Sequence, residues 1–257
     1  TLGPEGIASH ERAAVHLYAI VAEVWGRIRD RLREGRRLGE GEVQGWMLSA
    51  FDQRGLETDS APVVAVGPHS ADPHYEPQAD GALLESGAVL QLDLWAKERG
   101  PEGVYADISW VGYLGPSVPA EVKRAFAAVR DARDLAVAFI AERLAAGAPP
   151  EGREVDQAVR AFLAQAGYGE HLRHRTGHAI DQRVHGFGAN LDSVEFPDPR
   201  RLLEGACFSV EPGVYLPGLP GFPRGAGFGV RTEVDVYIAG MRPVVSGGRP
   251  QTEPLTL

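Results

Sequence analysis

The order of predicted elements in the first half of this chain returns in the second half, and this repetition constrains the fold most. Amphipathic patterns, with apolar residues every three or four positions, predict one long and one short helix in each half, over residues 9–33, 41–55, 119–146 and 155–165. Apolar, strand-like runs follow each helix pair. The pattern predicts an α+β fold, in which units of about residues 9–115 and 119–240 form pseudo-twofold halves around one curved, mostly antiparallel sheet.

The strand-like runs cover residues 62–66, 88–95, 104–111, 206–215 and 230–238. A Gly/Pro turn at residues 99–103 separates the second run from the third, which predicts a β-hairpin. Residues 211–229 are rich in Gly and Pro, and we expect them to form a structured loop beside a site rather than a tight hairpin. Helices should cover the outer face of the sheet, which leaves the inner face for the acidic side chains.

Four acidic residues lie in or beside these apolar runs, two in each half: Asp93, Asp107, Glu211 and Glu233. An ionised carboxylate in apolar surroundings is costly unless a positive charge compensates it, so the four together need a charge on the order of +4. Two divalent cations supply that charge, lower the pKa of a shared water and polarise a scissile carbonyl. With His178 as an imidazole ligand, the set predicts a hydrolytic site for two metal ions.

Carboxylate and imidazole ligands suit Mn²⁺, Co²⁺, Fe²⁺ and Zn²⁺, and Mn²⁺ is our first choice for both ions. Each acid taken alone has a simpler explanation, as a solvated side chain or as the partner of an arginine. Arg231, two residues before Glu233 and on the same face of a strand, is either such a partner or a group that orients a ligand. The number of acids in apolar runs favours the metal site over these separate explanations.

Four histidines form a second group of candidates: His74, His174, His178 and His185. Histidines beside a two-metal centre can donate to a developing oxyanion or carry protons at neutral pH, whereas any one of them alone would be explained as a structural or surface group. His178 and His185 are seven residues apart, so both reach one cavity only where the chain bends between them. The sequence motifs of zincins, of Gly-x-Ser-x-Gly hydrolases and of Walker A proteins are absent.

Charge and cysteine content limit the partners and the compartment. The 257 residues carry 26 basic and 35 acidic side chains, a net charge of −9, which argues against a nucleic acid or an anionic membrane as the partner. Cys207, the only cysteine, cannot form an intrachain disulfide, and its apolar neighbours indicate a small buried side chain rather than a nucleophile. We therefore expect a protein of the reducing cytoplasm.

Short phrases around these candidates resemble a known family. They are, in chain order, Pro73-His74-Tyr75-x-Pro77, Asp93, Asp107, His174-x-x-Gly177-His178, His185, Glu211-Pro212-Gly213-Val214-Tyr215 and Gly229-Val230-Arg231-x-Glu233-x-Asp235. Their order and spacing, from about residue 9 to residue 238, resemble the M24 metallopeptidases, which have the pita-bread fold. The last two phrases resemble the Xaa-Pro branch, aminopeptidase P and prolidase, rather than methionine aminopeptidase.

The resemblance implies a role for each residue of the metal site. Asp93 and Asp107 would be ligands, with Asp107 bridging both ions, and His178 would bind one ion. Glu233 would bridge the two ions as well. Glu211 would be a ligand and also a proton carrier, which takes a proton from the attacking water and passes it to the leaving nitrogen.

The same resemblance implies the residues that meet the substrate. His74 and His185 would contact the substrate near the scissile carbonyl and take part in catalysis, and His174 and Arg231 would line the substrate pocket. The implied substrates are small peptides with proline in the second position. An Xaa-Pro bond has no N–H, so an enzyme that cleaves it needs a shaped proline pocket and protonation of the leaving nitrogen.

Four features depart from the usual pattern of that family. They are Ala179 in place of a second Gly, Gly186 in place of a Glu, Ser109-Trp110 in place of Thr-Arg, and a longer connection between Asp93 and Asp107. The metal ligands are unaffected, so the departures bear on substrate preference. The extra N-terminal domain common in Xaa-Pro peptidases has no counterpart in this sequence, so we expect residues 1–257 to be a single catalytic domain, either of a short member or of a fragment.

The sequence leaves other functions open. A general or methionine aminopeptidase is suggested by the single-domain length. A metal-free binding module of the same fold and a creatinase-like hydrolase are the remaining alternatives, and the presence of all five ligands argues against both. The oligomeric state, monomer or homodimer, is open as well.

Overall fold

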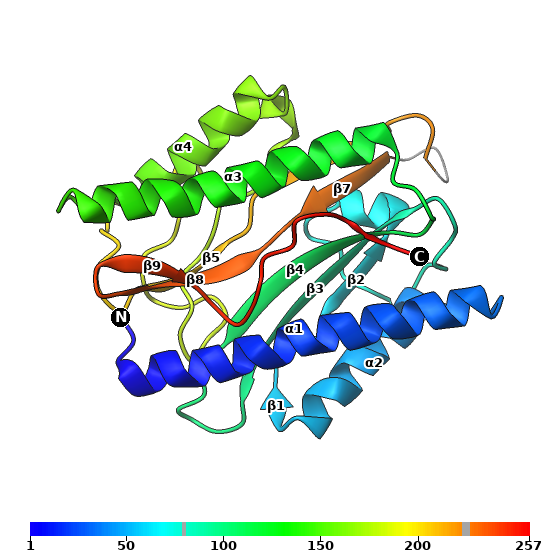
Figure 1. The fold of residues 1–257 in the computed structure, drawn as a ribbon, viewed down its shortest axis with the longest axis horizontal. Helices are drawn as coiled ribbons and strands as arrows, with labels where there is room; N and C mark the ends of the chain where they lie inside the picture. The colour runs from blue at the N-terminus through cyan, green and yellow to red at the C-terminus, as the bar shows by residue number, and fades with distance from the viewer. Residues whose placement is uncertain (79–80, 223–226) are drawn as a thin grey trace.

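The computed structural model describes residues 1–78, 81–222 and 227–257 (Figure 1). The first half contains α1 (Pro4–Arg33), α2 (Glu40–Gln53), β1 (Leu56–Glu57), β2 (Val63–Val66), the 3-10 helix η1 (Gly67–Ala71), β3 (Val89–Glu98) and β4 (Ala106–Tyr113). The second half contains α3 (Ala120–Ala145), α4 (Gly152–Gln165), the 3-10 helix η2 (Gly169–His171), β5 (Cys207–Val210), β6 (Gly213–Pro217), β7 (Gly227–Arg231), β8 (Val234–Ala239), β9 (Arg242–Val245) and β10 (Leu255–Thr256). The repeated order of helices and strands is confirmed.

The predicted helices are present, and local signals explain their ends. α1 begins earlier than predicted, at Pro4. Proline is favoured in the first turn of a helix, because the N–H groups of that turn have no partner within the helix and proline loses nothing by lacking one. α4 begins with a capping box, in which the Glu151 side chain accepts the Glu154 N–H and the Glu154 side chain accepts the Glu151 N–H. Gly35 and Gly147 follow α1 and α3 with φ of 72° and 68°, the left-handed conformation that commonly ends a helix.

β3 and β4 form the predicted hairpin, and its register places the first two acids. Asp93 pairs with Ser109 and Trp95 pairs with Asp107, so Asp93 and Asp107 are diagonal neighbours on the same face. β2 and β1 pair with β3, and β10 pairs with β4. The longer connection between the two acids is therefore the far end of this hairpin, which reaches away from the site.

Alternation along the strands separates the core from the acidic face. Leu90, Leu92 and Leu94 of β3 are buried in the apolar cluster that contains α1 and α2, whereas Asp93 between them points to the opposite face. The apolar residues of β8 are buried in a second cluster, which contains α3 and α4. In Figure 1, α1 crosses β3 and β4, and α3 lies beside β7 and β9. Helices thus cover the outer face, as predicted.

Two predicted strands are each broken in two, which corrects the expectation of unbroken runs over residues 206–215 and 230–238. β5 ends before Glu211 and Pro212, and β7 ends before Thr232 and Glu233. Pro212 has no N–H for a ladder, and the Glu211 N–H donates to the Thr176 carbonyl at 2.8 Å. The Glu233 N–H donates to the Ser109 carbonyl of the first half at 3.2 Å. The strands therefore form three hydrogen-bonded groups with interruptions at these acids.

The expectation of a structured loop over residues 211–229 is wrong for residues 213–217 and 227–229, which form strands. β6 and β7 form an antiparallel pair from Gly213 opposite Arg231 to Pro217 opposite Gly227. The glycines of β7 explain the misreading, because Gly weakens a strand pattern yet allows close backbone approach. A Cβ at Gly229 would lie 2.0 Å from the Ser70 carbonyl oxygen of η1, so only glycine fits there. Residues 223–226 of the predicted loop lie outside the described residues.

Among the residues that the structure describes, no helix combines the length and hydropathy needed to span a membrane. α1, the longest, has 30 residues but carries charged side chains along one face. Its opposite face packs on β3 and β4, so its apolar residues belong to the protein core.

Candidate metal centre and substrate pocket

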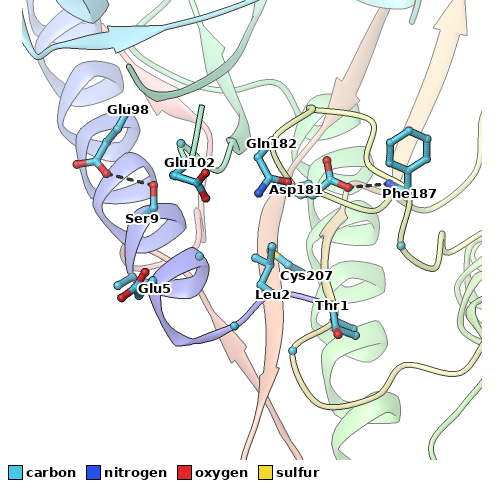
Figure 2. Close-up of a pocket in the computed structure, with 18 of the residues that line it drawn as sticks. Thr1, Leu2, Glu5, Ser9, Glu98, Glu102, Asp181, Gln182, Phe187 and Cys207 are labelled. Atoms are coloured by element: carbon cyan, nitrogen blue, oxygen red, sulfur yellow. Dashed lines mark hydrogen bonds between the residues drawn. The ribbon is translucent and has the colours of Figure 1, made fainter. Parts of the chain in front are cut away.

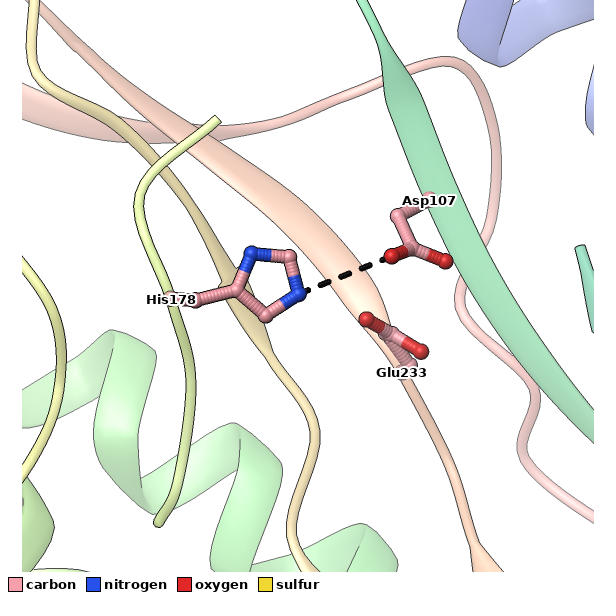
Figure 3. A group of neighbouring side chains, drawn as sticks. All are labelled: Asp107, His178 and Glu233. Atoms are coloured by element: carbon pink, nitrogen blue, oxygen red, sulfur yellow. Dashed lines mark ion pairs between the residues drawn. The ribbon is translucent and has the colours of Figure 1, made fainter. Parts of the chain in front are cut away.

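Three predicted ligands meet from separate segments of the chain (Figure 3). Asp107 comes from β4, His178 from a segment after α4, and Glu233 from the break between β7 and β8. One ligand atom of each lies within 4.8 Å of the ligand atoms of the other two. Glu211 borders the cluster, because its Oε1 is 3.4 Å from His178 Nε2, which in turn is 3.6 Å from Asp107 Oδ2.

Two oxygens of this cluster fit a bound cation. Asp107 Oδ1 and Glu233 Oε1 are buried, and no described residue forms a hydrogen bond with either atom. Buried polar atoms nearly always have a partner, so such oxygens indicate a missing positive group. Carboxylates with one imidazole are the donor set that divalent Mn, Co, Fe and Zn ions accept.

Electrostatics supports the same reading of the cluster. Burial raises the pKa of Asp107 well above its ordinary value, and the neighbouring Asp93 carboxylate raises it further. Burial likewise raises the pKa of Glu233, with Asp107 as the next cause. The protein alone thus disfavours the ionised form of both groups, and divalent cations would reverse that preference.

Glu211 behaves differently from the other acids. Burial acts to raise the pKa of Glu211, but the His178, His174 and Arg231 side chains and the hydrogen bond from Ser209 together outweigh it, so the pKa lies below its ordinary value. Ser209 Oγ donates to Glu211 Oε1 at 3.2 Å. Burial also lowers the pKa of His178, which favours the neutral imidazole that a metal ion binds.

Arg231 contacts the remaining acid directly. Its Nη2 donates to Asp93 Oδ2, and its Nε donates to Ser109 Oγ at 3.1 Å. Burial raises the pKa of Asp93, and the Arg231 guanidinium opposes that rise. Ser109 Oγ lies 2.7 Å from Asp93 Oδ1 and 2.8 Å from Glu233 Oε2, and its single hydrogen can serve only one of them at a time. Ser109 and Arg231 thus link ligands from both halves.

A buried acid on α4 holds the segment that carries His178. Asp156, which is fully buried, accepts the Thr176 N–H at 2.9 Å and the Thr176 hydroxyl at 2.6 Å. Its other oxygen accepts the Ser193 N–H at 2.8 Å. A Cβ at Gly177 would lie 2.0 Å from the Ser209 carbonyl oxygen, so glycine lets the segment lie against β5. These contacts aim His178 at the cluster.

The other predicted histidines of the second half lie around the same centre. The His185 ring stands edge-on to the His178 ring, with centroids 4.3 Å apart, so the chain does bend between them. His174 Nε2 lies 2.7 Å from the Tyr215 hydroxyl, and its Nδ1 donates to the Arg175 carbonyl at 2.7 Å. Burial lowers the pKa of both His174 and His185. Both rings are therefore neutral near pH 7.

A buried acid on α2 anchors the loop of His74. Glu40 is fully buried and accepts the Val66 N–H, the Tyr75 hydroxyl and the Ala82 N–H, each at 2.7 Å. His69, which is not among the four candidate histidines, also contacts Glu40, at 2.9 Å, and stacks on Tyr75. The sequence offered no signal for this anchor, because its donors come from three separate segments.

The predicted site residues border one cavity of about 580 Å³, a size typical of small-molecule sites. The nine predicted site residues on its wall are Asp93, Asp107, His178, Glu211, Glu233, His74, His174, His185 and Arg231. The wall residues that were not predicted include Asp59, Trp95, Arg175 and Glu195. Of these four residues, only Arg175 lies inside a phrase that resembles the family, the His174–His178 phrase. The sequence therefore offered no reason to select Asp59, Trp95 or Glu195.

The structure accounts for two departures from the family pattern. Any Cβ on residue 188 would lie only 3.1 Å from the Ala179 methyl group. Because residue 188 is glycine, the methyl group of Ala179 has room. A Cβ at Gly186 would lie 2.7 Å from Asp181 Oδ2, and that carboxylate accepts the Arg183 and Phe187 N–H groups. The Asp181 carboxylate thus occupies the space that a side chain on residue 186 would need.

A second cavity, of about 1080 Å³, is larger but has no ligand cluster (Figure 2). It lies between the start of α1, the β3–β4 turn and residues 180–189, and Ser9 donates to Glu98 at 3.1 Å on its wall. Cys207 borders it and is buried, as predicted, and burial raises the pKa of its thiol. None of the described residues that line this cavity is a predicted ligand, so the chemistry points to the smaller cavity.

Comparison with known proteins agrees with the geometry. The sequence pattern of metallopeptidase family M24 matches residues 13–239. The chain belongs to family M24. This M24 chain is similar to the probable dipeptidase PepE of Mycobacterium tuberculosis, with 32% identity over 203 residues that cover 78% of this chain and 49% of that protein. It is similar to the Xaa-Pro dipeptidase of Lactobacillus delbrueckii subsp. lactis, with 30% identity over 167 residues that cover 65% of this chain and 41% of that protein.

Solved structures show the same fold as this M24 chain. The X-Pro aminopeptidase of Thermotoga maritima matches it with a TM-score of 0.81 and 25% identity, over 100% of this chain and 64% of that one. The Xaa-Pro dipeptidase of Bacillus anthracis matches with a TM-score of 0.79 and 26% identity, over 99% of this chain and 63% of that one. The predicted pita-bread architecture is confirmed. The chain spans about half the length of the curated relatives it matches.

Proposed function

We propose that this chain is the catalytic domain of a dinuclear metal-dependent peptidase, which cleaves the bond between an N-terminal residue and proline. The buried cluster of Asp107, His178 and Glu233, with two carboxylate oxygens that no described residue satisfies, carries the proposal. The names of the relatives, Xaa-Pro dipeptidase and X-Pro aminopeptidase, support the substrate class.

Five residues would hold the two cations: Asp93, Asp107, His178, Glu211 and Glu233. Mn²⁺ is the proposed ion, and Co²⁺, Fe²⁺ and Zn²⁺ suit the same donors. When bound, the cations would activate the attacking water and stabilise negative charge on the carbonyl oxygen. Arg231 and Ser109 would hold Asp93 in place for that task.

The remaining steps belong to side chains of this protein. Glu211 would accept a proton from the attacking water, because its low pKa keeps it ionised, and would pass that proton to the leaving proline nitrogen. His185 and His74 would donate hydrogen bonds near the scissile carbonyl. His174 and Tyr215 would form the adjoining wall, where their rings meet at an angle.

Side-by-side hydrolysis of Ala-Pro, Ala-Pro-Pro and Met-Ala by the Mn²⁺-loaded protein tests the substrate class. We expect both proline peptides to be cleaved and Met-Ala to be cleaved poorly. A preference for Met-Ala would replace the proposal with a methionine aminopeptidase. A protein that binds no metal and cleaves no peptide would instead be a metal-free binding module.

The cysteine content and the net charge support proposals about the compartment and the partner. We propose the reducing cytoplasm, because the one cysteine is a buried free thiol. A small peptide, rather than a nucleic acid or a membrane, is the proposed partner, in keeping with the net charge of −9. Light scattering of the purified protein would distinguish a monomer from a homodimer, between which the sequence does not decide.

A further inference from the structure

The backbone of β4 lacks a partner strand on one edge beside the proposed ligand Asp107. Among the described residues, β4 pairs with β3 along one edge, and on the other edge it pairs with β10 only at Gly112 and Tyr113. Alternate residues of a strand present their backbone groups to the same edge. Buried backbone groups nearly always have a hydrogen-bond partner, so those of Asp107 and its alternate neighbours on this edge need partners from elsewhere.

Side chains take the place of that strand. The Asp107 N–H donates to Asp235 Oδ2 at 2.7 Å. Further along the same edge, the Val111 N–H donates to Gln251 Oε1 at 2.9 Å, and the Val111 carbonyl accepts from Gln251 Nε2 at 2.6 Å. Both side chains therefore complete the backbone of β4, but only Asp235 does so at a proposed ligand.

Asp235 has few other contacts, although it is an acid in the protein core. It is 1% exposed and lies between the buried Val234 and Val236 of β8. Its Oδ1 forms no hydrogen bond with any described residue, and His10 Nε2 is 3.9 Å from Oδ2, too far for a hydrogen bond. Burying an acid without a close cation is costly, and an apolar side chain would fill the space more favourably. The hydrogen bond to Asp107 explains why an acid stands here.

That hydrogen bond fixes the backbone of a ligand from the opposite half of the chain. Groups that hold a metal ligand from outside set its orientation and thereby the affinity for the ion. The contact needs only an acceptor oxygen, which a carboxylate, a protonated acid and a carboxamide all supply. We propose, on the basis of the metal-dependent function proposed above, that Asp235 is a positioning residue, which fixes Asp107 through its N–H so that the Asp107 carboxylate can bridge both ions.

The test is a calorimetric Mn²⁺ titration of the wild type, Asp235→Leu and Asp235→Asn. Asp235→Leu, similar in size but without an acceptor, should weaken Mn²⁺ binding by about 10- to 100-fold. Asp235→Asn keeps an acceptor oxygen and should stay within about threefold of the wild type. Electron paramagnetic resonance of the Mn²⁺-loaded samples gives a second readout. The wild type and Asp235→Asn should show an exchange-coupled pair of ions, and Asp235→Leu should show isolated ions.

Ser246→Ala is the matched control. Ser246 is buried, contacts His10 Nε2 at 2.7 Å and donates its N–H to the Asp235 carbonyl at 3.0 Å, but its side chain has no hydrogen bond with a proposed ligand. It should therefore bind Mn²⁺ like the wild type. If Asp235→Leu does not fold, Asp235→Val takes its place, because valine also lacks an acceptor and suits a strand.

Two outcomes would overturn the inference and leave the proposed function intact. One is wild-type Mn²⁺ affinity in Asp235→Leu, which would show that the contact does not matter to the site. The other is an equal loss of affinity in Asp235→Leu and Asp235→Asn, which would assign the effect to the charge rather than to the acceptor. A wild type that binds no pair of Mn²⁺ ions would overturn the proposed function together with this inference.

Discussion

The Arg231 guanidinium donates to the Asp93 carboxylate, and this contact joins the end of β7 to the middle of β3. Asp93 belongs to the first half of the chain and Arg231 to the second, so the pair crosses the seam between them. The same guanidinium reaches Ser109, whose hydroxyl lies between Asp93 and Glu233. Two of the four acids, Asp93 and Glu233, thus depend on contacts that the opposite half supplies.

Replacing Arg231 tests that dependence. We expect Arg231→Met to raise the pKa of Asp93 further and to weaken Mn²⁺ binding by about 10- to 100-fold, because an outer partner that holds a ligand is lost. Metal titration by calorimetry measures the effect. Arg124→Met, which removes an exposed arginine paired with Glu121, should bind the metal like the wild type. Unchanged Mn²⁺ affinity in Arg231→Met would assign Arg231 to the substrate alone.

Glu211 is expected to be indispensable for turnover. Glu211→Ala should abolish hydrolysis, since it removes a ligand and the proton carrier together. Glu211→Gln keeps an oxygen ligand but cannot take up a proton, so kcat should fall by about 10²- to 10⁴-fold even at saturating Mn²⁺. The matched control is Glu204→Gln, on an exposed turn away from the cavity. A Glu211→Gln enzyme with wild-type kcat would place the proton transfer elsewhere.

His185 should matter for chemistry and not for metal retention. Its ring packs edge-on against His178, but it is not among the predicted ligands. We expect His185→Ala to keep its metal content while kcat falls by about 100-fold, through loss of a donor near the scissile carbonyl. Metal analysis and steady-state kinetics on the same sample separate the two effects, and His16→Ala serves as control. If kcat did not change, the proposed contact with the reacting centre would be absent.

The crowding between Gly186 and Asp181 gives a stability prediction. Gly186→Ala should lower the free energy of unfolding by about 1–3 kcal/mol, because its Cβ would meet the Asp181 carboxylate. In an Asp181→Gly background this cost should shrink by at least about 0.5 kcal/mol, as measured by urea unfolding. Gly45→Ala, at a helical glycine with nothing within 4 Å, should instead stabilise the protein. If the changes in unfolding free energy caused by Gly186→Ala and Asp181→Gly were simply additive, there would be no clash between the two side chains.

His10 should make stability fall in mild acid. It is fully buried, its Nδ1 donates to the Tyr105 carbonyl at 2.6 Å, and burial lowers its pKa below 6.5. The unfolded chain binds a proton near pH 6.5 that the folded chain refuses, so the stabilisation is complete above that pH and is lost as the pH falls below it. One proton corresponds to at most about 1.4 kcal/mol per pH unit of slope. His10→Gln should make the fall of stability between pH 7 and 5 less steep, and an unchanged slope would contradict the assignment.

Local patterns in the sequence predicted the helices and the β3–β4 hairpin, because helical and strand periodicities arise within one segment. They failed at Glu211 and Glu233, where the backbone leaves its own strand to bond with Thr176 and Ser109. The nine site residues that line the cavity could be chosen from phrases along the chain. Glu40 and Asp59 could not, because their roles depend on neighbours that only the folded chain brings together.

The anchors at Glu40 and Asp156 have a consequence for the apoprotein. Each is a fully buried acid on the short helix of its own half, and each holds a histidine-bearing segment through hydrogen bonds that involve no predicted ligand side chain. Chelation would remove the catalyst without releasing these segments. In a metal-depleted chain both histidine-bearing segments would therefore stay hydrogen-bonded to their helices, so that removal of the ions and unfolding of the cavity wall are separate events.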